Sequence, residues 1–289
     1  DTIMAGATIT APALVPLIGL ALLLSPRWRR VGVALLVAFA AALVLSVAFQ
    51  ALVARPRPPK LWRVLRAPAY FGFPSGHAAL VCAAAVLATL VSRRLVGLRR
   101  LGLLVGVWLA AGLVSLSRVY LGHHYPGDVL AGAFLGAGVG AFVYGIVLAP
   151  REGAFPRLRW LLWLQLALVG LISLGAYLQV LPGLPLRWGD KLLHFFFMGS
   201  LAFGVDLWLR QRDLDLGVGR FRLRLPWALP LVGVPVLAEE LCQGLSPARS
   251  FELLDLAADF AGIALWLLLG RLLTRRGMAQ SLATAEPSV

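Results

Sequence analysis

Residues 31–54 read VGVALLVAFAAALVLSVAFQALVA, a continuous run of apolar and small residues without one charged side chain. An α-helix needs about 20 predominantly apolar residues to cross the hydrocarbon core of a bilayer. The run therefore predicts a membrane-spanning helix and decides the fold class. Eight more apolar segments predict further spans, at residues 8–25, 75–92, 101–117, 128–149, 160–180, 191–209, 227–245 and 256–274. We accordingly predict an all-α fold, a polytopic transmembrane helical bundle of about nine spans.

The composition of the whole chain agrees with this prediction. Of its 289 residues, 60% are hydrophobic and 14% are charged, whereas soluble domains are about 45–50% apolar and about 25% charged. This balance excludes a soluble enzyme, a disordered tail and a small disulfide-stapled domain. The two cysteines, Cys82 and Cys242, lie inside apolar runs, which predicts free thiols rather than a disulfide.

The basic residues are distributed unevenly among the predicted loops. The net charge is +14, and 18 of the 27 Lys and Arg residues lie in alternate loops, at positions 27–30, 93–100, 151–159, 210–224 and 271–276. By the positive-inside rule these loops are cytoplasmic. The N-terminus then faces outward together with the loops at 55–74, 118–127, 181–190 and 246–255. The basic excess therefore reflects topology, and we expect no nucleic-acid partner.

Three polar clusters fall on the outward loops of the first half. They are Arg55-Pro56-Arg57-Pro58, Pro74-Ser75-Gly76-His77, and the set Ser117-Arg118, His124 and Asp128. Taken singly, each has an ordinary explanation: a stiff loop, a helix N-cap, or a polar residue at the membrane rim. Taken together, they place complementary groups for phosphate chemistry in one compartment.

Four of these residues are suited to hold a phosphate group. The guanidinium groups of Arg57 and Arg118 are planar forks of donors that match phosphate oxygens. Ser75 and Gly76 stand at the start of a predicted helix, where backbone N–H groups and the helix dipole favour an anion.

The remaining residues are suited to act on the phosphate. His124 and Asp128 are four residues apart at the mouth of a helix, so the carboxylate can accept one ring N–H and leave the other nitrogen free to attack phosphorus. His77 can then protonate the leaving oxygen. No set of metal ligands is visible, so we expect a metal-independent reaction without a cofactor.

The pattern resembles the type 2 phosphatidic acid phosphatase superfamily, whose signatures are KxxxxxxRP, PSGH and SRxxxxxHxxxD. PSGH is complete at 74–77, and SRxxxxxHxxxD is complete at 117–128. The resemblance implies hydrolysis of a phosphate ester through a phosphohistidine. It further implies roles for the matched residues: His124 as nucleophile, Asp128 as its partner, His77 as general acid, and Arg57, Ser75, Gly76 and Arg118 as phosphate ligands.

Two departures from the family pattern stand out. Gln50 occupies the position of the first Lys, which keeps a hydrogen-bond donor near the phosphate but removes a charge. We expect Arg55 or Lys60 to compensate. The first motif also ends the second predicted span, whereas the family places it after the third helix of its core. We therefore expect the first helix of the phosphatase core to be missing from the chain, ahead of Asp1.

The segment between the first two motifs bears on the substrate. Residues 61–66 form a short basic amphipathic stretch, which either lies at the membrane interface or packs as a re-entry turn. In both cases the site opens at the outer interface, which favours a lipid phosphate that arrives laterally.

The second half carries polar groups that membrane segments normally avoid. They are Asp190, Lys191, His194, Glu239, Glu240, Gln243, Arg249 and Asp255. They form either an internal network that staples the helices or a functional site. This half resembles the VanZ-like family in Asp190-Lys191-xx-His194, Glu239-Glu240-xx-Gln243, Arg249-Ser250-Phe251 and Asp255 through Gly262, although Asp259 stands where Asn is expected. We expect this half to bind or present an anionic lipid.

These observations predict two modules, a membrane lipid phosphatase domain at 1–154 and a VanZ-like transmembrane domain at 155–289. We expect a multi-pass protein of the bacterial inner membrane that hydrolyses undecaprenyl diphosphate or a related lipid phosphate at its outer face. The alternatives are a phosphatidylglycerol phosphate or phosphatidic acid phosphatase, a lipid phosphotransferase, and a non-catalytic lipid-binding or transport protein. The expected partners are the lipid substrate and the bilayer, and the sequence carries no indication of oligomeric state.

Overall fold

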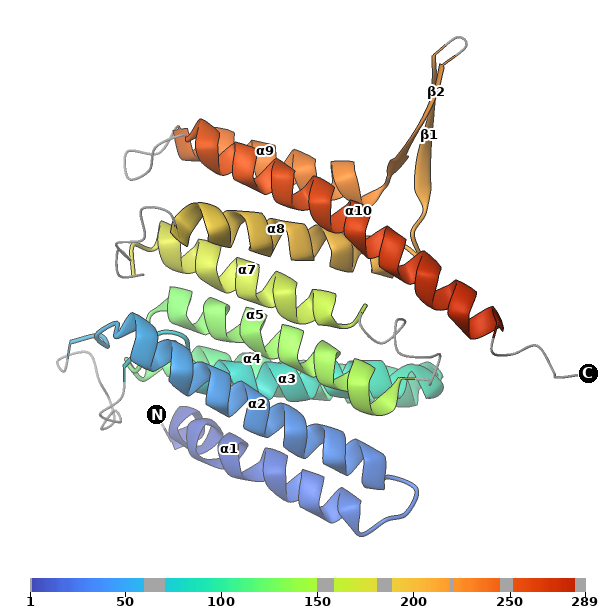
Figure 1. Ribbon diagram of the computed structural model, residues 1–289. Helices are drawn as coiled ribbons and strands as arrows, with labels where there is room; N and C mark the ends of the chain where they lie inside the picture. Colours follow the sequence, from blue (N-terminus) through green and yellow to red (C-terminus); the bar gives the residue numbers. More distant parts are fainter. Residues whose placement is uncertain are drawn as a thin grey trace, which may run out of the picture. The chain divides into compact units, whose positions relative to one another are not determined.

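The computed structural model describes residues 2–59, 71–149, 159–180, 189–218, 221–244 and 252–283. Each of the nine predicted apolar segments overlaps one α-helix (Figure 1). The helices described are α1 (Thr2–Leu23), α2 (Arg29–Val53), α3 (Gly76–Val91), α4 (Gly97–Tyr120), α5 (Pro126–Val143), α7 (Leu161–Tyr177), α8 (Gly189–Trp208), α9 (Ala228–Gly244) and α10 (Leu253–Ala283). A 3-10 turn, η2 (Ser92–Arg94), follows α3, and a π-helical turn, η3 (Tyr144–Leu148), extends α5.

Fewer helices than predicted are long and apolar enough to span a membrane. Within the described ranges, four meet that standard: α2, α4, the α5–η3 run Pro126–Leu148, and the segment Leu253–Thr274 of α10. A fifth is added if α1, which bends by 42° between Met4–Thr10 and Ala13–Leu23, is taken as one span. The helical character is therefore confirmed, and the four or five candidate spans support a multi-pass membrane protein, but the nine predicted spans are not reached within the described residues.

One element within the otherwise helical fold is a β-hairpin that the sequence analysis did not predict. Residues 210–224 were expected to be only an Arg-rich loop, but they contain most of an antiparallel hairpin of β1 (Asp213–Val218) and β2 (Phe221–Pro226). Leucines alternate with polar residues along both strands, which is the period-two pattern of a half-buried strand. In Figure 1 the hairpin projects from the chain between α8 and α9.

The chain divides into two compact units. The first comprises residues 1–151 with 163–183, and the second comprises residues 152–162 with 184–289. Most of α7 thus packs with the first unit, although it lies beyond the predicted module boundary between residues 154 and 155. The reason is a close contact with α5, because a Cβ placed on Gly138 would lie 2.6 Å from the carbonyl oxygen of Trp163 and 2.3 Å from the Cβ of Ala167.

The centre of the first unit is the contact between α3 and α5. Gly132, Gly136 and Gly140 recur every four residues and therefore share one face of α5. A Cβ at any of them would lie 2.1–2.5 Å from a carbonyl oxygen of Ser75 or of α3. The backbones of the two helices can touch only because these positions lack side chains. Their N-terminal ends, which carry the PSGH motif and Asp128, are thereby held together.

The second unit is built around α8 and α10. A Cβ on Gly262 would lie 2.1 Å from the carbonyl oxygen of Phe195, and one on Gly199 would lie 2.3 Å from the ring of Trp266. Edge-to-face ring contacts between Phe195 and Phe196, and between Phe196 and Trp266, line the same pair of helices. These small-residue contacts fix α8 against α10, and α9 packs beside both.

Candidate active site

The three polar clusters of the first half meet at one end of the first unit. The Ser75 N–H donates to the Asp128 carbonyl at 2.8 Å, which joins the start of α3 to the start of α5. The Gln50 amide Nε2 donates to the Pro74 carbonyl at 2.8 Å and ties the end of α2 to the same loop. The site is therefore assembled by hydrogen bonds between segments that are far apart in the sequence.

His124 lies at the centre of this site and is only 3% exposed. Its Nδ1 is 2.8 Å from the carbonyl oxygen of Gly72. A carbonyl can only accept, so Nδ1 carries the proton and Nε2 carries the lone pair. Nε2 lies 3.1 Å from Arg57 Nη1, which donates to it and also donates to the His123 carbonyl at 3.0 Å.

Asp128 does not hold the histidine in the way the sequence predicts. Its Oδ2 is 3.7 Å from His124 Nδ1, beyond hydrogen-bond length, and accepts the Tyr125 N–H at 2.9 Å instead. Its Oδ1 accepts from Arg55 Nη1 at 2.5 Å. The Arg55 guanidinium also lies over the Tyr125 ring, 4.4 Å from its centroid. The buried carboxylate therefore joins Arg55 to the N-terminus of α5, and the Gly72 carbonyl fixes the tautomer of His124.

Two buried polar atoms of the site have no hydrogen-bond partner in the described part of the chain. They are Ser75 Oγ and Arg118 Nε, on side chains that are 0% and 1% exposed. Buried polar groups are nearly always paired. Both atoms can donate, so an anionic oxygen would satisfy them. Ser75 is the N-cap of α3 and makes no side-chain cap bond, which leaves its hydroxyl available for such a ligand.

His77 and Gly76 occupy the first turn of α3. His77 is half-buried and lies within electrostatic range of His124, Arg118 and Arg57. The N–H groups of the first helical turn have no partner within the helix. A side chain at Gly76 would come within 3.7 Å of Ser46. The structure thus brings His77 and the α3 N-terminus to the same place as the two arginines.

The environment of His124 sets its charge. Burial lowers the pKa of the imidazole below its ordinary value of 6.5, the Asp128 carboxylate opposes this change, and Arg57 and Arg118 lower the pKa further. The ring is therefore neutral at pH 7, with an Nε2 lone pair that faces the cationic side of the site.

Comparison with known proteins agrees with this geometry. Residues 31–152 match the PAP2 superfamily. The matched range contains all three motifs, and it confirms the resemblance expected for the first half. No solved structure matches the chain.

Several curated phosphatases resemble the PAP2 region. The undecaprenyl-diphosphatase of Sulfolobus acidocaldarius is 36% identical over 120 residues, which are 40% of this chain and 55% of that protein. The decaprenylphosphoryl-5-phosphoribose phosphatase of Mycobacterium tuberculosis is 40% identical over 126 residues, 41% of this chain and 62% of that protein. The lipid A 4'-phosphatase of Bacteroides thetaiotaomicron is 40% identical over 74 residues, 26% of this chain and 30% of that protein. The chain thus spans less than two thirds of each relative.

The PAP2 region contains one group that the sequence did not predict, the Gly72 carbonyl, and one predicted residue, Arg55, with a different partner. The Gly72 carbonyl is a backbone acceptor and has no residue-type signal, although a Cβ at this glycine would lie 3.3 Å from Asp128 Oδ2. Arg55 was expected to replace the charge lost at Gln50, but it pairs with Asp128 instead. Lys60, the other candidate, lies outside the described residues.

Outside the PAP2 region, the polar residues of the second half form an ion-pair network. Lys191 on α8 binds Asp255 and also Glu252, the latter at 2.6 Å. His194 Nδ1 lies 3.1 Å from Asp259 Oδ1, and the Glu252 N–H donates to Glu240 at 2.7 Å. Glu239 is half-buried beside them.

This network connects α8, α9 and α10, so these polar residues hold the three helices together. The side chains of Asp190 and Gln243, and the whole of Arg249, lie outside the described residues. The VanZ-like resemblance and the binding of an anionic lipid stay predictions.

Proposed function

We propose that this protein is a membrane lipid phosphatase that acts through a phosphohistidine at His124. The observation that carries the proposal is the fixed tautomer: Nδ1 donates to Gly72, and Nε2 faces Arg57 beside two unpaired buried donors, Ser75 Oγ and Arg118 Nε. A nucleophilic nitrogen and a set of phosphate donors thus occupy one site.

The phosphoryl group of the substrate enters the position beside His124 Nε2 that the Arg57 guanidinium occupies in this structure. Its oxygens accept from Arg57, Arg118 Nε and Ser75 Oγ, and from the N–H groups at the start of α3. When Arg57 turns from Nε2 to a phosphate oxygen, the lone pair of His124 is released toward phosphorus. Binding of the substrate therefore also exposes the nucleophile.

The proposed reaction has two steps, and in each step every bond that forms is matched by one that breaks. First, Nε2 bonds to phosphorus as the bond to the leaving oxygen breaks, and His77 gives that oxygen its proton. Water next attacks phosphorus and gives a proton back to His77. The P–N bond breaks, and inorganic phosphate leaves. The Gly72 carbonyl holds the Nδ1 proton throughout, and the two arginines stabilise the charge that builds on the phosphoryl oxygens.

The proposed substrate is a polyprenyl diphosphate or phosphate, with undecaprenyl diphosphate as the preferred case. Support comes from the names of two relatives, an undecaprenyl-diphosphatase and a decaprenylphosphoryl-5-phosphoribose phosphatase. The predicted position of the site at the outer face of a bacterial inner membrane is compatible with such a lipid. Phosphatidylglycerol phosphate and phosphatidic acid are the competing substrates.

The test is phosphate release by the full chain in detergent. Undecaprenyl diphosphate, phosphatidylglycerol phosphate and phosphatidic acid are compared in the presence of EDTA, beside His124→Ala and the adjacent variant His123→Gln. We expect release that survives chelation, is fastest with undecaprenyl diphosphate, vanishes in His124→Ala and is retained in His123→Gln.

Other outcomes separate the alternatives. Loss of activity with EDTA, reversed by a divalent metal, would overturn the metal-free mechanism. Release that occurs only when a second lipid or glycan is added would identify a phosphotransferase. Binding of the lipids without any turnover would identify a non-catalytic lipid-handling protein.

A further inference from the structure

The β1–β2 hairpin has two chemically different faces. Its register pairs Leu214 with Leu225 and Leu216 with Leu223, and it pairs Asp215 with Arg224 in between. Side chains of successive residues in a strand point to opposite sides. The four leucines therefore share one face, and the charged residues share the other.

The leucine face is only partly covered by the described part of the chain: Leu214 and Leu225, at its base, are half-buried, whereas the two outer leucines are exposed. Leu216 is 42% exposed and Leu223 is 54% exposed. A single two-stranded hairpin is marginally stable in water unless its apolar face packs against something. Any surface that stabilises this hairpin must therefore be apolar and must contact its leucine face.

The base of the hairpin is held at the end of a membrane span. Arg271 of α10 binds Asp213, the first residue of β1, and the Gln211 amide donates to Thr274 Oγ1 at 2.7 Å. Thr274 is the last residue of the candidate span Leu253–Thr274. The hairpin thus leaves the second unit at the level where that span reaches the membrane surface.

Two apolar hollows flank the base of the hairpin. One, of about 280 Å³, is lined by Leu214, Leu216 and Leu225 from the hairpin and by Leu229, Val234 and Leu237 of α9, among other apolar residues. Its α9 wall is open to the outside, since Val234 is 63% exposed.

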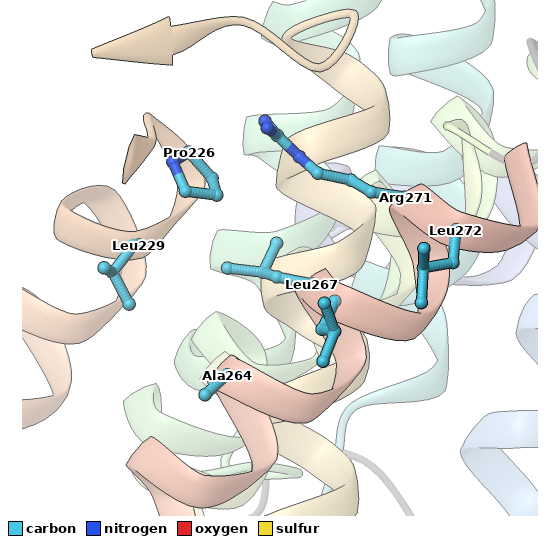
Figure 2. A pocket seen from close by; sticks show the side chains of 7 residues that line it. Pro226, Leu229, Ala264, Leu267, Arg271 and Leu272 are labelled. Atoms are coloured by element: carbon cyan, nitrogen blue, oxygen red, sulfur yellow. The ribbon is translucent and has the colours of Figure 1, made fainter. Parts of the chain in front are cut away.

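The other hollow, of about 300 Å³, lies where β2 ends. Figure 2 shows Pro226 and Leu229 on one side, Ala264 and Leu267 on α10 on the other, and the Arg271 side chain leaving its helix at the edge. Arg271 is already paired with Asp206 at 2.7 Å and with Asp213, so the hollow itself presents an apolar surface.

The polar face of the hairpin is basic on its second strand. Arg222 and Arg224 are exposed along β2, and the exposed Arg210 and Arg212 precede the base of the hairpin. Arg224 and Asp215 form an ion pair in which both side chains are 72% exposed. An exposed pair of this kind contributes little stability, so Arg224 can exchange to another anion. Anionic headgroups attract arginines at a membrane surface.

We propose that the β1–β2 hairpin lies in the interface of the lipid leaflet on the Arg-rich side. Acyl chains cover Leu216 and Leu223 and enter the two hollows, and the guanidinium groups of Arg222 and Arg224 bind anionic headgroups. The hairpin is thus a lipid-binding surface of the second unit, and this assignment is independent of the chemistry at His124.

The test measures the depth of two neighbouring residues that face opposite ways. In a Cys82→Ala, Cys242→Ser background, Leu223→Cys and, separately, Arg222→Cys are labelled with an environment-sensitive fluorophore. The full chain is placed in nanodiscs that hold one copy each, made of zwitterionic lipid with or without anionic lipid. Quenching by doxyl-labelled lipids and by aqueous iodide is then compared at the two positions.

The proposal predicts that the label at 223 is quenched severalfold more by doxyl lipid than the label at 222, and that iodide shows the reverse order. The depth of the 223 label should be about 5–10 Å below the headgroups, as for interfacial amphipathic segments. Anionic lipid should increase the doxyl quenching at 223, and salt should reverse that gain. Equal access of iodide to both labels would overturn the proposal.

Protection of the 223 label from both quenchers would also overturn it, because protein rather than lipid would then cover the leucine face. Doxyl quenching that is identical with and without anionic lipid would overturn the headgroup assignment. Helix content and elution volume equal to those of the Cys-free parent confirm that the labelled variants are folded.

Discussion

The buried Asp128 carboxylate accepts hydrogen bonds from Arg55 and from the Tyr125 N–H. The hydrogen bond that orients the His124 ring is therefore the one from Nδ1 to the Gly72 carbonyl. This arrangement separates two tasks at the residue scale. Gly72 fixes which nitrogen of His124 carries the proton and which carries the lone pair, whereas Arg55 and Asp128 hold the start of α5 and the loop that carries His124. The motif residues could be predicted from the sequence because their types and spacing are specific. The backbone acceptor could not, because any residue type has a carbonyl.

Arg55→Ala is expected to lower kcat by about 10- to 100-fold, because a hydrogen bond to a charged group contributes about 1.5–3 kcal/mol. KM should change little, since Arg55 contacts Asp128 rather than substrate. Arg55→Lys should recover part of kcat. Steady-state kinetics in mixed micelles provide the measurement. A raised KM with unchanged kcat would instead place Arg55 on the phosphate.

The lowered pKa of His124 predicts the acid limb of the pH profile. A histidine must be neutral to attack, so kcat/KM should fall only below pH 6.5, the ordinary pKa of the group. In Asp128→Asn the limb should move to still lower pH, because the carboxylate that raises the pKa is gone. The ionisation of the substrate is measured separately by phosphorus NMR. A limb above pH 6.5 in the wild type would contradict the burial of a neutral His124.

At the element scale, the glycine face of α5 decides whether the two motif loops can meet. Gly132, Gly136 and Gly140 allow the α5 backbone to touch α3, and the contact at Gly132 is with the carbonyl oxygen of Ser75 itself. The packing of α5 against α3 therefore also sets the distance between the two motif loops of the site. The positions of the helices could be predicted from apolar run length, but this contact could not, because glycines are also frequent elsewhere in the chain.

Gly136→Ala is expected to destabilise the protein by about 1–3 kcal/mol, the usual cost of overpacking a close contact. The added Cβ would lie 2.1 Å from the Ala79 carbonyl oxygen. Gly106→Ala on α4 is the matched control, because nothing lies within 4 Å of its Cβ and alanine favours a helix. Thermal unfolding in detergent should show a lower Tm for Gly136→Ala only. Equal Tm values would show that α3 and α5 do not pack this closely.

The β1–β2 hairpin is an element that composition alone does not predict. Charged and apolar residues alternate in two stretches, DLDL at 213–216 and FRLRL at 221–225, which is a strand signal. The basic content of these residues predicts on which side of the membrane they lie, but only the alternation predicts their secondary structure. The signal was present in the sequence, unlike that of the Gly72 carbonyl.

At the scale of the whole molecule, the alternation of basic loops predicts one orientation for the first unit. The Arg-rich turn near residue 28 lies at one end of α2, and the site lies beyond its other end. Arg30 donates to the Val147 carbonyl at 2.6 Å, which places the end of the α5–η3 run at the basic side as well. The boundary between modules was harder to predict, because α7 is apolar on all sides and its partner is fixed only by packing.

The orientation can be tested by labelling single cysteines in intact spheroplasts. In the Cys82→Ala, Cys242→Ser background, Phe71→Cys should react with a membrane-impermeant maleimide, because residue 71 is 45% exposed near the site. Trp28→Cys should react only after lysis. Labelling of residue 28 but not 71 in intact cells would reverse the predicted topology.

The most direct test of the phosphohistidine is to trap it. The full chain is mixed with ³²P-labelled undecaprenyl diphosphate and quenched in alkaline detergent within the first turnover. We predict a labelled protein whose phosphate is stable in base and labile in acid, maps to the peptide that contains His124, and is absent in His124→Ala. Rapid release of phosphate with no labelled protein at any time, and with activity retained in His124→Ala, would contradict the central claim.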